Sequence, residues 1–405
     1  MLNIVIFNGG RGAATIIPAL LQQQGVNVTS VVNAYDDGKS TGEIRRFFGM
    51  LGPSDIRKVQ QLMLPENDQD YEANMDLFDF RFPVTCDRSK VLADLKAFAD
   101  DNSTELVGIR FGSKKVQGAL RHFVNEFVDG LTLSEKVRGG AFEFADCSIM
   151  NCIYAGAFLA LDRNIEMATL YIDRLFKLKG TVIPTSIENK KLVALQENGE
   201  MLCCEADIVE LRSNVRIERI YLIDHELDLA NMDALCTDEK RLYLEKNHSF
   251  VTVSERVRHS IQHADIIIYA AGTQHSSLYP TYLSSGLANA VADNKAALKV
   301  FTTNIGADYE TPNYKASDYI LGAYRYLSHS DKRSYDMQEL MDVNLINQSH
   351  LKADETYVEF DKEGFADIPV RLCVENFEST VEPGKHDGPK LVKAILDKYD
   401  AISNL

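Results

Sequence analysis

Short apolar runs alternate with stretches of helical periodicity along most of the chain. Residues 3–8 form a continuous apolar run, residues 13–24 place their isoleucines and leucines on one side of a helix, and residues 28–34 form a second β-rich run. A strand, a helix and a second strand in this order are the usual start of a doubly wound parallel sheet. The pattern therefore predicts a βαβ unit at the beginning of the chain.

The same alternation continues toward the C-terminus and predicts an α/β fold with a Rossmann-like, doubly wound, mainly parallel sheet. A polar, helix-forming stretch at residues 60–130 is predicted to be a helical insertion, which could be a lid or a dimer surface. The insertion is predicted to lie within one domain that spans residues 1–405. Further strands are predicted at 182–185, 219–223, 265–271, 299–304 and 370–374, a hairpin at 191–208 with its turn at Asn198-Gly199, and helices at 89–98, 114–128, 146–161, 254–263 and 389–399.

Composition limits the classes of partner. Of 405 residues, 45% are hydrophobic, which is enough for a sizeable core, and the net charge is −16. This charge argues against nucleic acid and anionic membranes as partners, because both attract lysine and arginine patches. The N-terminus lacks a basic leader, no apolar run reaches bilayer length, and an odd number of cysteines, seven, is typical of a reducing compartment. We expect a cytoplasmic protein that forms a homo-oligomer, in the simplest case a dimer.

The chemistry concentrates in loops that follow predicted strands. Residues 36–46 combine two aspartates, two hydroxyls, two glycines and two arginines, and residues 9–12 form a glycine-rich turn. Carboxylates suit Mg²⁺, whereas hydroxyls, glycine backbone and arginine suit phosphate oxygens. The two loops together predict a metal–diphosphate site for a nucleotide ligand.

Blander interpretations of these loops remain open. Residues 10–15 nearly match the dinucleotide-binding fingerprint but could form a tight turn without a ligand, and residues 36–46 could be a solvated, capped helix start. A P-loop is excluded because its leading glycine would have to be at position 33, which is Asn33. Asp55 could be a third metal ligand or only a helix cap. His275 and His386 lie in polar loops and are further candidates, whereas no Gly-x-Ser-x-Gly motif supports a serine hydrolase.

Taken in order, these motifs resemble the CofD-like superfamily across nearly the whole chain. This superfamily joins the 2-phospho-L-lactate transferases to the gluconeogenesis factor family of nucleotide-sugar-binding proteins. The residues that carry the resemblance are Asn8–Gly12 (a GGTG loop), 36–45 (DDGGSSGRLR), 53–57 (PGDIR), 148–151, 182–185 (VLPVT), 264–268 with 272–280, 299–311, and 385–391.

The resemblance implies which residues form the site. Asp36, Asp37 and Asp55 would be catalytic and would hold Mg²⁺. The residues implied to bind the nucleotide and its phosphates are Gly9, Gly10, Arg11, Gly12, Ser40, Thr41, Gly42, Arg45, Arg57, Asn151, Thr185, Gly272, Thr273, Ser276 and Ser277. Some positions depart from the family pattern, notably Arg11 for a threonine and Lys39 for a glycine, which leaves the base and the acceptor open.

Two functions follow from the resemblance. The first is a Mg²⁺-assisted transfer of a phosphorus-containing group from a nucleotide-linked donor to an alcohol acceptor, which the acid set favours. The alternative is a non-catalytic regulator that binds a UDP-sugar and changes its contact with a partner protein, and the loop at residues 36–46 looks closer to this branch. An NAD-dependent oxidoreductase is a third reading, which fits the hydroxyls and arginines of this loop poorly.

Overall fold

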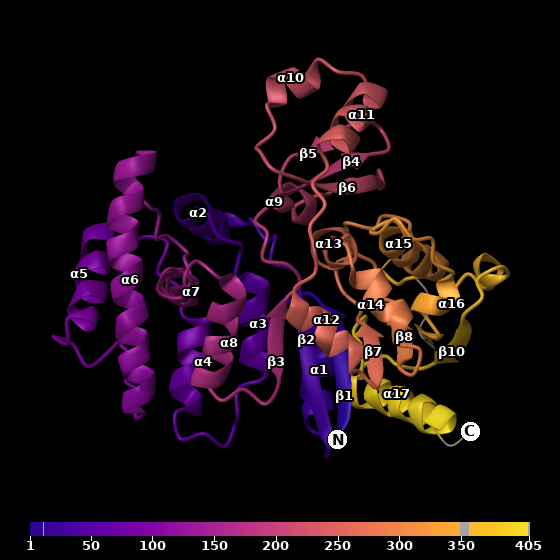
Figure 1. Ribbon diagram of the computed structural model, residues 1–405, viewed down its shortest axis with the longest axis horizontal. Coiled ribbons are helices and arrows are strands. Elements are labelled where there is room, and N and C mark those ends of the chain that lie inside the picture. The colour runs from indigo at the N-terminus through magenta and orange to yellow at the C-terminus, as the bar shows by residue number, and fades with distance from the viewer. Residues whose placement is uncertain (11, 349–355, 404–405) are drawn as a thin grey trace.

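A seven-stranded parallel sheet forms the centre of the computed structural model, which describes residues 1–10, 12–348 and 356–403 (Figure 1). The strand order is β10-β9-β8-β7-β1-β2-β3, and every neighbouring pair is parallel. The predicted doubly wound α/β fold is thereby confirmed. The strands are β1 Leu2–Asn8, β2 Val26–Val32, β3 Thr181–Pro184, β7 Ile266–Tyr269, β8 Leu298–Thr302, β9 Val343–Asn347 and β10 Arg371–Glu375.

The order of the strands reverses at β1. The chain proceeds from β1 through β2 to β3 on one side, and then returns to β7 and continues through β8 and β9 to β10 on the other. In open α/β sheets, ligands bind outside the carboxyl ends of the strands at this point of reversal. The loops that follow β1, β2 and β7 are therefore the expected place for a site.

Seven helices separate β2 from β3, and three of them, α4, α5 and most of α6, lie within residues 60–130. The predicted helices at 89–98 and 114–128 correspond to α5 and α6, although α6 runs ten residues further. Figure 1 shows α5 and α6 on the side of α7 that faces away from the sheet. The division into one domain with an insertion at 60–130 stays a prediction. The helices are α2 Lys39–Phe48, α3 Ser54–Leu62, α4 Tyr71–Asp79, α5 Arg88–Ala99, α6 Lys114–Arg138, α7 Ile149–Ala160 and α8 Ile165–Leu175.

Other helices cover the sheet and connect its second half. Helix α1 packs against α17 and α3, and α12 packs against α14. No helix among the described residues combines the length and the apolar character that crossing a bilayer requires. The bounds are α1 Ala13–Leu21, α12 Glu255–Gln262, α13 Tyr279–Tyr282, α14 Leu287–Asp293, α15 Ala316–Ser328, α16 Met337–Leu340 and α17 Gly388–Ser403, with a short 3₁₀ helix, η2, at Lys362–Phe365.

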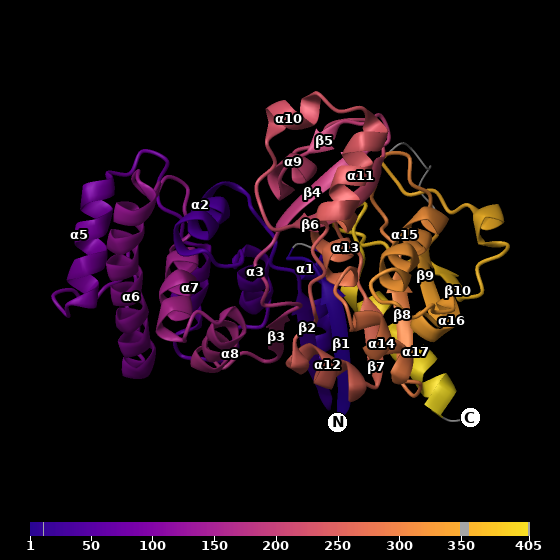
Figure 2. The ribbon, with the colours of Figure 1, turned by 45° about the horizontal axis from the view of Figure 1, so that its top comes forward.

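A small antiparallel sheet between β3 and β7, which we call the cap (residues 191–247), lies beyond the ends of β1 and β2 opposite the N-terminus (Figure 2). The predicted hairpin is present, with Gly199 at φ +86° in its turn. The predicted strand is wrong beyond Leu202, because residues 205–209 form a helix. The cap contains β4 Lys191–Gln196, β5 Met201–Leu202, β6 Ile217–Ile223, α9 Glu205–Val209, α10 Leu229–Asp233 and α11 Thr237–Asn247.

Two glycines test the helix packing. A Cβ on buried Gly156 of α7 would lie 1.8 Å from the carbonyl oxygen of Phe123 in α6, whereas a Cβ on exposed Gly118 of α6 would meet nothing within 4 Å. We expect Gly156→Ala to lower the free energy of unfolding by about 1–3 kcal/mol through overpacking. Gly118→Ala should raise it by about 0.5–1 kcal/mol, because alanine restricts the unfolded chain.

Urea denaturation of the two variants and the parent chain measures both effects. Equal stability of Gly156→Ala and the parent would show that α6 and α7 do not pack as closely as described.

Candidate functional site

A cavity of ≈ 290 Å³ opens between the loops after β2 and β7 and helix α9 of the cap. We call it the switch-point pocket, because it lies where the strand order reverses. It brings together seven of the predicted site residues: Asp36, Ser40, Thr41, Asp55, Thr273, Ser276 and Ser277. The other residues that line it are Gly38, Lys39, Ser54, Lys58, Arg81, Asp146, Glu205, Ala206, Val209 and Glu210.

The turn after β1 forms the wall behind the pocket. A Cβ on Gly9 would lie 2.6 Å from the Cβ of Ser277, and one on Gly10 would lie 2.5 Å from a carboxylate oxygen of Asp55. A Cβ on Gly12 would similarly lie 2.2 Å from the carbonyl oxygen of Ala271. These glycines therefore let three loops approach one another, although they do not line the cavity themselves. Arg11 lies outside the described residues.

The second loop places a helix start at the pocket. One oxygen of Asp36 accepts a hydrogen bond from the Gly38 N–H at 3.0 Å, and the other accepts from the Thr41 hydroxyl at 3.4 Å. Helix α2 follows without a side-chain cap at its N-terminus, and Lys39, Ser40 and Thr41 of its first turn line the cavity. Such a turn offers N–H donors and a partial positive charge to an anion.

The start of α3 adds a second acid to the pocket. The Asp55 carboxylate pairs with the Lys58 ammonium at 2.9 Å and accepts a hydrogen bond from the Ser277 hydroxyl at 3.4 Å. Ser277 also accepts a hydrogen bond from the Thr273 hydroxyl at 2.9 Å. Asp55 therefore connects α3 with the loop that follows β7.

The loop after β7 is ordered by a buried carboxyl group. Residues Gln274–Leu278, predicted to be a loop, form one turn of π-helix, η1. Glu310, which is 2% exposed, accepts hydrogen bonds from the N–H groups of His275 and Ser276 at 2.9 Å each and from the Ser276 hydroxyl. Asn33 at the end of β2 donates to the carbonyl oxygen of Ser276 at 3.0 Å. Contacts from both sides thus fix the two serines at the pocket.

Acids outnumber bases around the cavity. The lining contains five carboxylates and three basic side chains, and two of those bases already pair with acids: Lys58 with Asp55, and Arg81 with Asp146 at 3.3 Å. Burial, followed by the charges of Asp36 and others, raises the pKa of Glu205 well above its usual range. Lys39 is exposed and has no ion-pair partner in the described part of the chain. The pocket therefore has a surplus of negative charge that a cation would relieve.

Asp37 and Arg45 do not line the pocket. The carboxylate of Asp37 lies 3.7 Å from the Arg45 guanidinium and 3.2 Å from the ammonium of Lys191 in the cap. Arg45 donates to the carbonyl oxygen of Tyr35 at 2.8 Å and to the side chain of Asn189 at 2.9 Å. Their contacts attach the segment leading into the cap to α2, so that neither group is free to hold a ligand.

Other predicted residues support the pocket from behind. The Arg57 guanidinium donates to the carbonyl oxygen of Phe78 at 2.6 Å, and burial lowers its pKa. Asn151 donates to the Ser40 hydroxyl at 3.3 Å, and the hydroxyl of Thr185 lies 3.2 Å from that of Thr281. The structure places Gly42 against Asp37, where a Cβ would lie 2.8 Å from the carbonyl oxygen.

The two candidate histidines are buried rather than placed in the pocket. Burial lowers the pKa of His275 to about 3 and that of His386 to about 4, so that both rings are neutral at physiological pH. Neither lines the switch-point pocket. Burial accounts for both shifts, so the polar sequence around each ring was a poor guide to its exposure.

Part of the predicted magnesium set suits the ion. Asp36 and Asp55 line the pocket with carboxylate oxygens, the donors that Mg²⁺ prefers, although other protein groups already bond to each of them. Asp37 instead faces two cations outside the pocket. Within residues 1–10, 12–348 and 356–403, no three acidic, histidine or cysteine side chains converge closely enough to hold an ion. In nucleotide sites, Mg²⁺ is commonly held by one or two carboxylates together with phosphates of the substrate. Asp36 and Asp55 fit that arrangement.

Three residues that sequence reasoning missed contribute to the site. Glu205 reaches the pocket from the cap and accepts a hydrogen bond from the Asp37 N–H at 3.2 Å. Lys58 lies one turn after Asp55, a spacing that could have suggested an ion pair. Glu310 lies in the stretch that resembles the family motif at 299–311, but only the fold shows which loop it holds.

Comparisons with known proteins point to one family. A family model described as 2-phospho-L-lactate transferase CofD matches residues 4–378. A gluconeogenesis factor of Listeria monocytogenes is 24% identical over 403 residues, which cover 97% of this chain and 94% of that protein. One of Halalkalibacterium halodurans is 23% identical over 319 residues, which cover 78% of this chain and 71% of that protein.

The fold also occurs in a solved structure. The crystal structure of a UPF0052-family protein from Bacillus halodurans superimposes with a TM-score of 0.67 and 18% identity. The match covers 98% of this chain and 100% of that one. At this identity the likeness shows a shared fold.

Glu310 gives a test of how the third loop is held. Burial, aided by the charge of Asp308, raises its pKa from 4.5 to about 8. A carboxyl with a raised pKa in the folded state loses its contribution to stability as pH rises from the unfolded value through the folded one. Glu310→Gln can keep all three hydrogen bonds, since its carbonyl accepts from both N–H groups and its amide donates to Ser276.

We therefore expect Glu310→Gln to gain stability relative to the parent as pH rises from about 4.5 to about 8, by at most about 1.4 kcal/mol per pH unit, with no further change above that range. Urea unfolding at a series of pH values measures the difference. Glu310→Ala, which breaks the three bonds, serves as the control and should be less stable than Glu310→Gln at every pH. A pH-independent difference between parent and Glu310→Gln would contradict the buried carboxyl.

Proposed function

The chain belongs to the 2-phospho-L-lactate transferase CofD family, and we propose that its switch-point pocket binds a nucleotide with a diphosphate group together with Mg²⁺. We propose further that it transfers a phosphorus-containing group from this ligand to an alcohol acceptor. The observation that carries the proposal is the convergence of an uncapped helix start, six serine and threonine side chains and five carboxyl groups on one cavity at the strand reversal.

The donors for phosphate come from two of the loops. The first turn of α2 would offer backbone N–H groups, the Ser40 hydroxyl and the Lys39 ammonium. From η1, Ser277 would offer its hydroxyl, whose contact with Asp55 is long at 3.4 Å. Helix starts and hydroxyl-rich turns are common phosphate sites, because their donors and partial charge suit an anion. Arg45 and Arg57 would support this arrangement indirectly, since buried carbonyl groups already occupy their guanidinium groups.

The surplus of acids in the pocket supports a metal-bound form of the ligand. A free diphosphate would meet the carboxylates of Asp36 and Asp55, and like charges repel. Mg²⁺ held by Asp36 and Asp55 would neutralise this repulsion and polarise the phosphoryl oxygens when bound. The protein's own groups would position the ligand, which accounts for most of the catalysis in phosphoryl transfer.

A regulatory binder is the alternative within the same family. The relatives compared above carry the name gluconeogenesis factor, and the cap places α9 over the pocket, where a ligand would alter its contacts. In this reading the pocket binds a UDP-sugar without turnover, and the change in the cap is passed to a partner protein. The two functions share the phosphate contacts and differ in the need for metal and in product formation.

A binding panel separates these possibilities. We expect Mg²⁺ with GDP or GTP to raise the melting temperature, and the stabilisation should approach about 2.7 kcal/mol at a hundredfold excess over Kd. Stabilisation by UDP-N-acetylglucosamine alone, without dependence on Mg²⁺, would instead favour the regulatory binder. Stabilisation by NAD alone would contradict both proposals.

A pair of lysine variants tests the location of the phosphate contact. Lys39 and Lys115 both lie exposed in the first turn of a helix, but only Lys39 lines the pocket. We expect Lys39→Ala to weaken binding of the preferred nucleotide by at least about tenfold, because a charge-assisted hydrogen bond is lost. Lys115→Ala changes the net charge equally and should leave the Kd unchanged. Isothermal titration calorimetry measures both, and equal effects of the two variants would rule out this phosphate site.

A further inference from the structure

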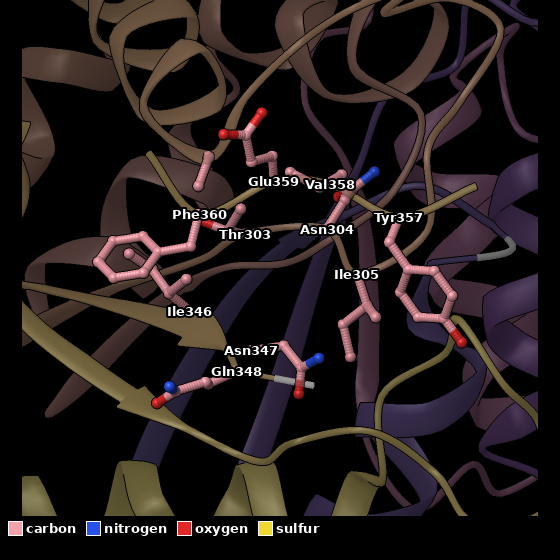
Figure 3. Close-up of a pocket in the computed structure, with 11 residues that line it drawn as sticks. Thr303, Asn304, Ile305, Ile346, Asn347, Gln348, Tyr357, Val358, Glu359 and Phe360 are labelled. Atoms are coloured by element: carbon pink, nitrogen blue, oxygen red, sulfur yellow. The ribbon is translucent and has the colours of Figure 1, made fainter. Parts of the chain in front are cut away.

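A second cavity of ≈ 280 Å³ lies at the carboxyl ends of β8 and β9, in the other half of the sheet (Figure 3). Thr303, Asn304 and Ile305 directly follow β8, while Asn347 ends β9. The full lining is Thr303, Asn304, Ile305, Ala316, Ile346, Asn347, Gln348, Tyr357, Val358, Glu359 and Phe360. None of these residues lines the switch-point pocket.

The chemistry of this cavity differs from that of the first. Its lining contains three side-chain amides, two aromatic rings and several aliphatic groups, and no lysine or arginine among the described residues. The single acid, Glu359, lies 3.2 Å from the ammonium of Lys315. Without a lining cation, this surface would not hold a phosphate, whereas amides and aromatic faces suit an uncharged ring with hydrogen-bonding edges.

The size of the cavity sets a further limit. Pockets for drug-sized ligands usually measure about 300–1,000 Å³, so this cavity suits a single ring system or one sugar-linked base. Figure 3 shows the rings of Phe360 and Tyr357 on opposite sides of the labelled group, with Asn347 and Gln348 along one margin between them. Aromatic and aliphatic side chains on these sides can contact the flat faces of a base, while amides reach its edges.

One segment forms a wall between the two cavities. Asn304, in the second cavity, accepts a hydrogen bond from the Gly272 N–H and donates to the Gly272 carbonyl oxygen, both at 3.0 Å. Thr273, the next residue, lines the switch-point pocket. Glu310, six residues after Asn304 in the chain, holds the η1 turn that carries Ser276 and Ser277. The cavities are therefore neighbours across a single hydrogen-bonded contact.

We propose that the second cavity binds the uncharged nucleoside part of a ligand whose phosphates occupy the switch-point pocket. This inference rests on the proposed function, because it assigns the two halves of one nucleotide to two chemically different cavities. The charged half meets helix N–H groups, hydroxyls and Lys39, and the neutral half meets amides and aromatic rings. Asn304 lines the second cavity and bonds to Gly272, next to Thr273 of the first. A base bound in the second cavity could therefore contact Asn304.

A cavity-filling variant tests the assignment. Val358 is half-buried in the lining and bonds to Ile305 through its backbone, so Val358→Trp fills the space without removing a polar contact. Val381, 85% exposed, supplies the matched control Val381→Trp. The probes are uridine and guanosine, each without phosphate, and inorganic pyrophosphate with Mg²⁺. We expect one nucleoside to bind the parent chain and to bind Val358→Trp at least about tenfold more weakly.

The two kinds of probe distinguish failure of this inference from failure of the proposed function. Pyrophosphate with Mg²⁺ should bind both tryptophan variants as well as the parent, and both variants should melt cooperatively. If neither nucleoside binds, or if Val358→Trp binds it as tightly as Val381→Trp does, the inference is overturned, while pyrophosphate binding still supports the switch-point pocket. If pyrophosphate fails to bind the parent chain in the presence of Mg²⁺, the proposed function itself fails.

Discussion

The site depends on the absence of side chains at Gly9 and Gly10. Loops from β1, β2 and β7, more than two hundred residues apart at the extremes, can meet only if the turn after β1 takes almost no space. A methyl group at Gly10 would displace the carboxylate of Asp55, and one at Gly9 would displace Ser277. The order of the parallel strands brings the loops to one edge, and the glycines allow them to touch.

Buried polar contacts then fix the loops at some cost in stability. Glu310 lies in the interior with three hydrogen bonds and no cationic partner in the described part of the chain, and its raised pKa reflects that burial. A buried carboxyl usually destabilises a fold unless its hydrogen bonds are satisfied. Here it holds the η1 turn in the shape that presents two serines to the pocket. Such pre-organisation reduces the entropy lost when a ligand binds.

The parts predicted from the sequence are those set by local patterns. Continuous apolar runs correctly located β1, β2, β7 and β8, because strands of a parallel sheet are buried on both faces. β9 was missed. The helix at 205–209 was also missed, because the alternation of apolar and polar residues in the hairpin was taken to continue as far as residue 208.

Long-range contacts explain the remaining differences at the candidate site. In the sequence, Arg45 looks like a residue that binds phosphate. In the fold it instead donates to Asn189, 144 positions away, and forms an ion pair with Asp37. Glu205 reaches the pocket because the cap lies beyond the ends of β1 and β2, as Figure 2 shows. A linear motif identifies which residue types gather near a strand end, but the fold decides which of them line the pocket.

The two cavities differ in charge in the same way as the two ends of a nucleotide. The switch-point pocket carries more acids than bases, so that it suits phosphate only in company with a cation. The second cavity has no lysine or arginine among the described residues that line it. A nucleotide has this same division, with a charged phosphate end and a neutral base at the other. The contact between Asn304 and Gly272 lies between the two cavities, at the boundary where that change of character would fall. The arrangement of charge thus favours a nucleotide over a ligand that is charged, or neutral, throughout.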